Sequence, residues 1–251
     1  MDGNSELSTV ERALEVLELL WDLNGAGPTE VAERLDVPKG TVHGYLRTLT
    51  NAGYTVNEGG TYRVSYRFLT MGGRLKHRSR LFHVAKPEVE RLADETGEIV
   101  DVSIEENGHS VTLHHAMGDQ SLRLGLYPGM TTPIHAHAAG KAVLAYLPAD
   151  RRDEILAGDL EAMTERTITD PEDLREELAT VRDRTYAYDW DQQVTGMGVV
   201  AAPILVDDEV LGSIAIIAPT DRLQNHSYRE ELIRYVREAS NTVEVSYQYS
   251  N

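Results

Sequence analysis

Residues 37–49 read VPKGTVHGYLRTL, and they decide the fold of the first third of the chain. Pro38 suits the first turn of a helix, and Gly53 suits its end. Apolar side chains recur on one face of this expected helix, at Val42, Leu46 and Leu49. A shorter helix is expected over 29–35, across a tight joint. Two short helices joined in this way predict a helix-turn-helix.

Residues 8–24 predict a helix that precedes this pair. Apolar side chains recur there at helical spacing, at Val10, Leu14, Leu17 and Trp21. The sequence from Ser8 to Glu11 has the form of a capping box. We therefore expect a helix that begins after Ser8 and covers the apolar faces of the two shorter helices.

Residues 54–64 follow the third helix and form two β-rich arms around Gly59-Gly60, which predicts a hairpin wing. Such a wing beside a helix-turn-helix is typical of a DNA-binding unit. The side chains that we expect to face DNA are Lys39, Thr41, His43, Arg47, Thr48 and Arg63. All of them can bond to phosphates or base edges, and none is acidic. Arg63, on the wing, is expected to touch phosphate only.

The charge distribution favours DNA as the partner of this part of the chain. The 251 residues carry a net charge of −17, yet residues 37–80 hold eight basic side chains against one acid, Glu58. Residues 79–251 hold 15 basic and 31 acidic side chains. A unit of the same fold that only docks proteins is the alternative. The coincidence of the basic stretch with the third helix and the wing favours duplex DNA.

The acidic composition of the remainder of the chain also indicates a protein that works at high salt concentration. Only 4 of the 24 basic residues are lysine. An acidic, lysine-poor composition is typical of a halophilic protein that works in molar salt, and an acidic protein of ordinary salt is the alternative.

The composition excludes several chemistries. The chain has no cysteine, and hence no disulfide framework, thiolate metal site or cysteine nucleophile. No run approaches the ~18 apolar residues of a membrane span, and the first residues have no leader pattern, so we expect a soluble cytoplasmic protein. The letters of a dinucleotide fingerprint at 196–201 follow polar residues rather than a strand. We expect no cofactor and no enzymatic activity.

Residues 81–251 predict an α+β domain with a mainly antiparallel sheet. Strands are expected over 100–104, 111–113, 122–126, 186–190, 199–206 and 210–217. Asn107-Gly108 is a strong hairpin signal between the first two. Helices are expected over 81–96 and 138–147, within 150–184, and after a cap at Ser227. Residues 66–80, with a hinge at Gly72-Gly73, are expected to link this domain to a DNA-binding domain over 1–65.

Several of these stretches resemble the IclR family of transcriptional regulators. They lie at 9–17, 30–35, 37–43, 53–54, 133–142, 167–170 and 196–204. The resemblance implies a winged helix-turn-helix joined to an effector-binding domain whose fold is similar to GAF and PAS-like sensors. It implies a ligand-responsive DNA-binding regulator that acts as a homodimer or homotetramer. The chain departs from the family at Gly40, usually serine, and at Gly44, often arginine or another polar residue, and each glycine costs the helix roughly 1 kcal/mol.

The resemblance also implies an effector pocket against the sheet, under the loop that precedes the helix at 138. Carried over residue by residue, its lining is Ala138, Ala139, Asp189, Val199, Ala215 and Ile217. Family members that bind small carboxylates have a cysteine at Val199 and serines at Ala215 and Ile217. Those polar groups are absent from this sequence.

Asp189 is the expected polar anchor of that pocket, although an aspartate in this alternating strand pattern also fits one that points to solvent. We expect the effector to offer hydroxyl or amine donors to Asp189 and any acid group to the amides near Ala139. Sugar acids and hydroxy acids meet both demands.

Two histidine pairs leave alternatives open. His114-His115 and His135-x-His137 are expected to be structural or exposed, with effector contact or a metal site as the other readings. The functional alternative to a ligand-responsive regulator is a DNA-binding architectural or interaction protein whose vestigial sensor domain only mediates oligomerisation.

Overall fold

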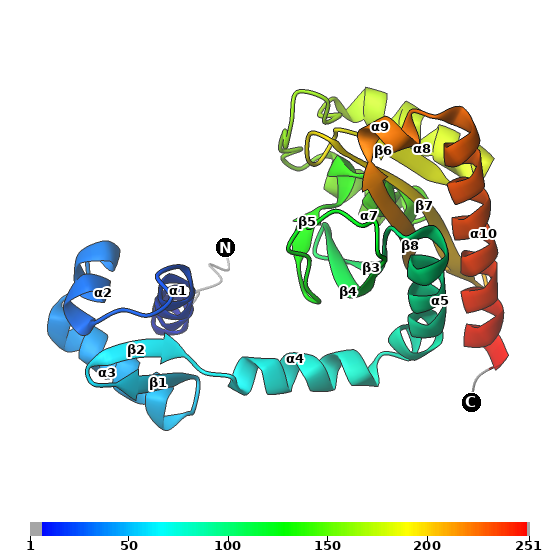
Figure 1. The fold of residues 1–251 in the computed structure, drawn as a ribbon. Helices are drawn as coiled ribbons and strands as arrows, with labels where there is room; N and C mark the ends of the chain where they lie inside the picture. Colours follow the sequence, from blue (N-terminus) through cyan, green and yellow to red (C-terminus); the bar gives the residue numbers. More distant parts are fainter. Residues whose placement is uncertain (1–6, 250–251) are drawn as a thin grey trace. The chain divides into compact units, whose positions relative to one another are not determined.

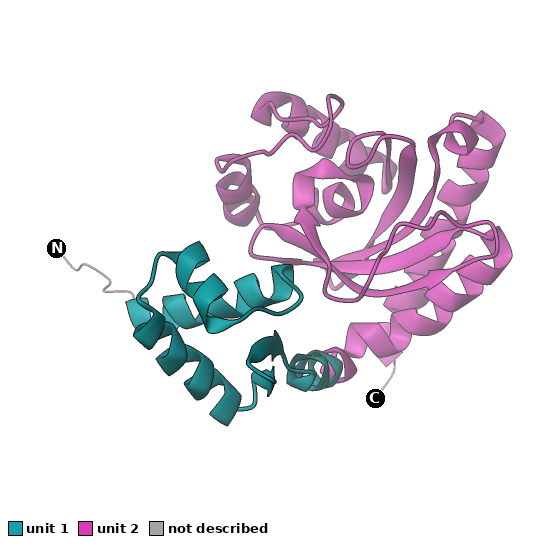
Figure 2. Ribbon diagram, turned by 60° about the vertical axis from the view of Figure 1, so that its left-hand side comes forward, with its two compact units in different colours: residues 1–75 teal, residues 76–251 magenta. Residues whose placement is uncertain are grey.

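The computed structural model describes residues 7–249 and divides the chain into two compact units, 1–75 and 76–251 (Figure 2). The boundary falls inside helix α4 (Arg67–Arg78). The glycines expected to form a hinge, Gly72 and Gly73, lie in the middle of this helix without a break. A Cβ atom added at either would meet nothing within 4 Å, so no close packing requires glycine there.

The first unit is a winged helix-turn-helix, as predicted (Figure 1). Its elements are α1 (Ser8–Asp22), α2 (Pro28–Leu35), α3 (Lys39–Asn51), β1 (Thr55–Glu58) and β2 (Thr61–Val64). The two strands pair antiparallel, and the turn places Gly59 and Gly60 at φ +63° and +96°. Both angles lie in the left-handed region, which glycine adopts without strain, and this is why the wing turns at that point.

The prediction for the face that α1 buries is wrong for three of its four residues, and only Leu17 packs, half-buried, against the core. The core of the unit takes Val16 and Leu20. The side chains of Val10 and Leu14 are each 55% exposed, and that of Trp21 is 70% exposed. Helix α1 carries apolar side chains on two faces, and periodicity alone does not say which of them meets α2 and α3.

The predicted capping box at Ser8 is also wrong. Ser8 already belongs to the helix, whose N-cap is Leu7, with no side-chain capping bond. The last helix of the chain begins at His226 rather than after a cap at Ser227. There the Tyr228 amide donates to Asn225 Oδ1 at 3.2 Å, so Asn225 takes the capping role.

The second unit is built on a six-stranded sheet with the order β5-β4-β3-β8-β7-β6, in which all neighbours are antiparallel. Its strands are β3 (Ile99–Glu106), β4 (His109–Met117), β5 (Thr131–Pro133), β6 (Ala187–Trp190), β7 (Met197–Val206) and β8 (Glu209–Pro219). The strand expected over 122–126 is absent. Leu122, Leu124 and Leu126 instead pack, half-buried, against the core from an irregular segment.

Helices cover both faces of the sheet (Figure 1). One face packs against α5 (Arg80–Thr96) and α10 (His226–Tyr249), and α9 (Thr220–Leu223) leads into the latter. The other face packs against α6 (Ala138–Leu144), accompanied by α7 (Ala149–Leu156) and α8 (Pro171–Arg184). A single turn of 3₁₀-helix, Ile134–Ala136, precedes α6. The observed α+β class with an antiparallel sheet is the predicted one.

The register of the sheet positions the candidate pocket. Asp189 pairs with Val199, and Val199 pairs with Ile217, so these side chains form one row across β6, β7 and β8. The adjacent row contains Ala215, which pairs with Asp101 on β3. Both rows face α6, because residues paired directly across antiparallel strands share a face.

Candidate functional site

The outer face of α3 is the candidate DNA-binding surface. Val42, Leu46 and Leu49 are buried against the core of the first unit. The predicted contact residues of α3 are all exposed, namely Lys39, Thr41, His43, Arg47 and Thr48. The Thr48 hydroxyl donates to the Gly44 carbonyl at 2.9 Å, so it can only accept a hydrogen bond from a further partner.

A groove of about 470 Å³ lies between α3 and the wing. Its lining is Gly40, His43, Gly44, Arg47, Thr50, Asn51, Asn57 and Tyr62. An added Cβ at Gly40 or Gly44 would meet nothing within 4 Å, so the two glycines hollow this surface. Asn51 and Asn57, which no sequence pattern marks, also line the groove.

Arg63 lies on the wing, where its partner across the hairpin is Val56. Its guanidinium forms an ion pair with Glu58 on the other arm. Both side chains are substantially exposed, so the pair contributes little to stability, and Arg63 can exchange it for a phosphate at small cost.

The six predicted pocket residues come together in the second unit. Ala138 and Ala139 begin α6, directly over the rows of Val199, Ala215 and Ile217. All five are buried in one hydrophobic cluster. Asp189 at the end of the first row is 3% exposed, so the reading in which it points to solvent is wrong.

Asp189 is bound on one side and unpartnered on the other. The Ala138 amide donates to its Oδ2 atom, so Asp189 itself takes an amide of the α6 terminus that was expected to receive an acid group of the effector. Its Oδ1 atom is buried and makes no hydrogen bond of normal geometry among the described residues, although the backbone amide of Gln192 lies near the carboxyl group. Burial raises the pKa of Asp189 to about 6, although the nearby Lys141 opposes the rise.

Lys141 is a buried cation that the sequence analysis missed. Its side chain is 0% exposed, and its Nζ atom donates to Gln192 Oε1 at 2.8 Å and lies 3.6 Å from Glu177 Oε1. The signal was present in the sequence, because a single lysine interrupts the small and apolar residues of 138–144. A lysine in such a helix needs acidic or polar partners when it is buried.

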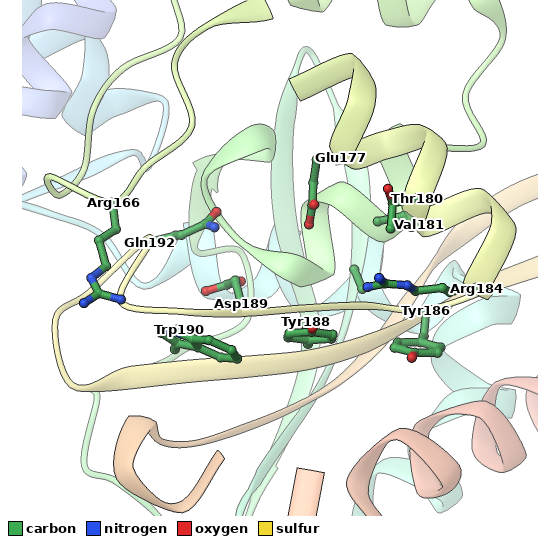
Figure 3. Close-up of a pocket in the computed structure, with 11 residues that line it drawn as sticks. Arg166, Glu177, Thr180, Val181, Arg184, Tyr186, Tyr188, Asp189, Trp190 and Gln192 are labelled. Carbon is green, nitrogen blue, oxygen red and sulfur yellow. The ribbon is translucent and has the colours of Figure 1, made fainter. Parts of the chain in front are cut away.

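A cleft of about 480 Å³ opens beside these charges (Figure 3). Its lining is Arg166, Glu177, Thr180, Val181, Arg184, Tyr186, Ala187, Tyr188, Asp189, Trp190 and Gln192. Of the predicted pocket residues, Asp189 alone belongs to this lining. The cleft lies between α8 and β6, and a ligand in it would reach the carboxyl group of Asp189.

A second buried polar group lies one row away, next to Ala215. The Ser103 hydroxyl donates to Asp101 Oδ2 at 2.9 Å, and the other oxygen of Asp101 has no partner among the described residues. The Ser213 hydroxyl and His115 Nδ1, on the neighbouring strands, are likewise unpartnered there. Burial raises the pKa of Asp101 to about 7. We call Asp101, Ser103, His115 and Ser213 the buried polar patch.

The loop histidines are part of the fold around α6. His135 Nε2 lies 3.0 Å from the Glu161 carbonyl. His137 caps α6 by accepting the Gly140 amide at its Nδ1 atom, and its Nε2 atom lies 2.9 Å from Thr132 Oγ1. Burial lowers the pKa of His137 to about 3, so it is neutral at physiological pH. These bonds support the structural reading of both histidines.

On β4 the other histidine pair divides between the two faces of the sheet. His115 belongs to the buried polar patch, and His114 Nδ1 lies 3.3 Å from Lys76 Nζ near the end of α4. Within residues 7–249, no group of three or more histidine, aspartate or glutamate side chains is placed to hold a metal ion. No helix of that range is long and apolar enough to cross a membrane.

Comparison with known proteins supports both units. The family description "IclR helix-turn-helix domain" matches residues 9–59, and "Bacterial transcriptional regulator IclR C-terminal" matches residues 74–245. The chain is 33% identical over 246 residues to the probable HTH-type transcriptional regulator ArcR of Halobacterium salinarum, covering 95% of this chain and 93% of the relative. It is 32% identical to the HTH-type transcriptional regulator BhcR of Paracoccus denitrificans, covering 89% and 82%.

Solved structures share the fold over the whole chain. The IclR protein of Thermotoga maritima aligns with a TM-score of 0.80 at 22% identity, covering 97% of this chain and all of the other. An IclR homologue of Microbacterium hydrocarbonoxydans, solved in complex with 4-hydroxybenzoate, aligns with a TM-score of 0.81 at 23% identity, covering 96% and 100%. With both family models matched in order, this chain belongs to the IclR family of transcriptional regulators.

Proposed function

We propose that the protein controls transcription by binding one operator sequence with residues 1–65 and releasing or tightening that contact when an effector binds in residues 81–251, with 66–80 as the linker. The observation that carries this proposal is the pairing of an exposed basic α3 with a cleft that ends on an unpartnered buried carboxyl oxygen. Since its partner is the chromosome, we place the protein in the cytoplasm.

The proposed DNA contact has α3 in the major groove and the wing on the backbone. Lys39, Thr41, His43, Arg47 and Thr48 face the groove, and Arg63 faces a phosphate. Arg47 lines the hollow beside Gly44, where the missing side chain lets a base edge approach the helix. Arg47 is therefore the side chain that we expect to read a guanine.

Replacing Arg47 with alanine is expected to weaken operator binding by roughly 1–3 kcal/mol, because a bidentate contact to a guanine is lost. Arg63→Ala should weaken operator and random DNA to the same extent, since a phosphate contact carries no sequence information. The measurement is fluorescence anisotropy at fixed salt, with Arg175→Ala in the second unit as the charge-matched control. Unchanged operator affinity of Arg47→Ala would refute the orientation proposed for α3.

The exposed face of α1 supports a homodimer. Leu7, Val10, Leu14 and Trp21 lie three to seven residues apart and are all more than half exposed. We propose that a second copy covers this stripe, because a two-fold arrangement also presents two α3 helices to successive major grooves. A homotetramer would then form through the second units.

For the effector we propose a sugar acid or hydroxy acid whose hydroxyl donates to Asp189 Oδ1. The six pocket residues, Ala138, Ala139, Asp189, Val199, Ala215 and Ile217, stay the proposed binding region. The 4-hydroxybenzoate in the Microbacterium relative is also an acid with a hydroxyl group.

Asp189→Asn and Ala139→Leu are each expected to lower the effector response at least tenfold, the first by removing the acceptor and the second by pushing the start of α6 away from the sheet, against which Ala139 is packed. The measurement is a titration of the protein–operator complex with whichever compound releases the wild-type protein. Operator affinity without effector should stay unchanged in both variants. A normal response in both would place the sensor elsewhere.

The excess of acidic side chains predicts a dependence on salt. Residues 79–251 carry 31 acids against 15 basic side chains, and salt shortens the range of their repulsion from about 10 Å at 0.1 M to about 3 Å at 1 M. We expect the melting temperature to rise by about 5 °C or more between 0.1 M and 2 M potassium chloride, which corresponds to roughly 2 kcal/mol for a unit of this size. A melting temperature that does not change with salt concentration would contradict the prediction that the protein is halophilic.

One observation favours the architectural alternative. Five of the six predicted pocket residues pack against each other and do not line the cleft. A vestigial sensor domain would bind no small molecule and would only hold subunits together. A thermal shift screen of acids, sugars and aromatics separates the two functions, because a true effector raises the melting temperature by mass action.

A further inference from the structure

The cleft between α8 and β6 has a guanidinium group at each end. Figure 3 shows Asp189 and Gln192 between Arg166 at one end and Arg184 at the other. Arg184 comes from the last turn of α8, and Arg166 comes from the loop that precedes α8. Two cations from different elements thus line one cavity, with the carboxyl groups of Asp189 and Glu177 between them and Lys141 Nζ 3.6 Å from Glu177 Oε1.

The loop carrying Arg166 is anchored to the cleft. Thr164 Oγ1 donates to the Asp191 carbonyl at 2.6 Å, and Thr167 Oγ1 donates to the Gln192 carbonyl at 2.6 Å. Arg166 lies between these two threonines, and its Nε atom is 3.9 Å from Asp191 Oδ2. These bonds fix the backbone that presents Arg166 to the cavity.

The middle of the cleft favours a ligand group that donates a hydrogen bond over a carboxylate group. Asp189 Oδ1 is buried and makes no hydrogen bond of normal geometry within the described part of the chain, although the Gln192 backbone amide lies close to this carboxyl group, and a carboxylate placed in the middle of the cleft would meet the like charges of Asp189 and Glu177. A hydroxyl group satisfies this atom and can also accept from a neighbouring amide. Thr180 and Gln192 line the same space with further hydroxyl and amide groups.

The length of the cleft sets the size of the ligand. Arg184 stands near Tyr186 and Arg166 near Trp190, at opposite ends of a strand segment that spans roughly 13 Å at 3.3 Å per residue. Arg184 reaches into the cleft from the Tyr186 end and Arg166 lies beside its Trp190 end, which leaves room for a chain of about six carbons between two bidentate carboxylate contacts. The cavity of about 480 Å³ holds a molecule of that size.

We propose that the effector is a hydroxylated dicarboxylic acid of about six carbons, with one carboxylate on Arg166, the other on Arg184, and a central hydroxyl on Asp189. This inference rests on the proposed function and makes its effector class more specific. It also moves the acid groups from the amides near Ala139, one of which Asp189 occupies, to the two arginines.

The test uses compounds that differ only at their ends. D-Glucarate, D-gluconate and D-glucitol share one carbon skeleton and carry two, one and no carboxylates, and galactarate, galactonate and galactitol repeat the series with another configuration. Calorimetric titration of the full-length protein is expected to rank diacid, monoacid and polyol in that order in at least one series, with about tenfold between the first two. Equal affinity of diacid and monoacid, or binding by neither series, would overturn the inference.

Variants of the two arginines test whether each one binds a carboxylate of the ligand. Arg166→Gln and Arg184→Gln should each reduce the affinity for the diacid about tenfold, and the double variant should no longer distinguish the diacid from the polyol. Arg175→Gln, on the same helix but outside the cleft, should bind as wild type. Diacid binding that survives the double variant would also overturn the inference.

The two proposals fail in different ways. If another small molecule releases the operator and Asp189→Asn abolishes its effect, while neither diacid binds, only the effector class is wrong. If no small molecule in the screen changes DNA affinity or stability, the effector-responsive function itself is wrong.

Discussion

Replacing Gly140 with alanine is expected to destabilise the second unit by about 3 kcal/mol, although alanine is the better helix former by roughly 1 kcal/mol. A Cβ atom at Gly140 would lie 2.0 Å from the Ile134 carbonyl oxygen and 2.7 Å from its carbon. Both are backbone atoms of the 3₁₀ turn before α6, so no side chain can rotate away. Relief requires α6 and the 3₁₀ turn to move apart.

Denaturant unfolding monitored by circular dichroism measures this loss. Gly72→Ala in α4 is the matched control, because its new methyl group meets nothing within 4 Å and should raise helix stability by roughly 1 kcal/mol. Opposite signs for the two substitutions are the expected result. If Gly140→Ala instead stabilised the second unit, the turn at 134–136 would not be packed closely against Gly140 in solution.

Asp101→Asn is expected to stabilise the second unit by roughly 4 kcal/mol above pH 7 and by almost nothing near pH 4. The pKa of Asp101 is about 7 in the folded protein against 3.8 for an ordinary aspartate, because burial opposes its ionisation. The folded state therefore binds more protons than the unfolded state between these values. Stability falls as pH rises through this window, and the loss is complete above pH 7.

The difference between variant and wild type isolates Asp101, because Asp189, whose pKa is raised to about 6, contributes to both curves. Asparagine keeps an oxygen that can accept from Ser103 and removes the charge. The measurement is the free energy of unfolding from urea titrations at half-unit pH steps from 4 to 8.5. A difference that does not change with pH would show that Asp101 reaches a counterion or water in solution.

The helix-turn-helix was predictable because its signals are local. Pro38, Gly53 and the spacing of Val42, Leu46 and Leu49 act within one or two turns of helix, and the Gly-Gly turn determines the wing. The burial of α1 was not predictable in this way. Its two apolar faces are equivalent in sequence, and contacts with residues far along the chain decide which one joins the core.

The residues of the candidate pocket also divide into those that the sequence predicted and those that it did not. Asp189 was found through resemblance, and the register of β6 with β7 shows why it faces α6. Arg166 and Arg184 were missed because nothing in their own neighbourhoods marks them, whereas Lys141 stood out as a lone lysine among small and apolar residues and was overlooked. They meet Asp189 only after α6, α8 and the loop before α8 have packed against the sheet, and a linear pattern does not carry that information.

Two consecutive residues of β4, His114 and His115, lie on opposite faces of the sheet and connect the surroundings of those faces. His115 belongs to the buried polar patch on the face of the sheet that meets α6, while His114, on the opposite face, contacts Lys76 near the end of α4. The pairing of β3 with β4 contains a bulge between Val102 and Ser103, a place where a strand changes its twist readily. A change in the twist of β4 at this pair would therefore shift His115 in the patch and His114 beside Lys76 together, because one peptide unit joins them.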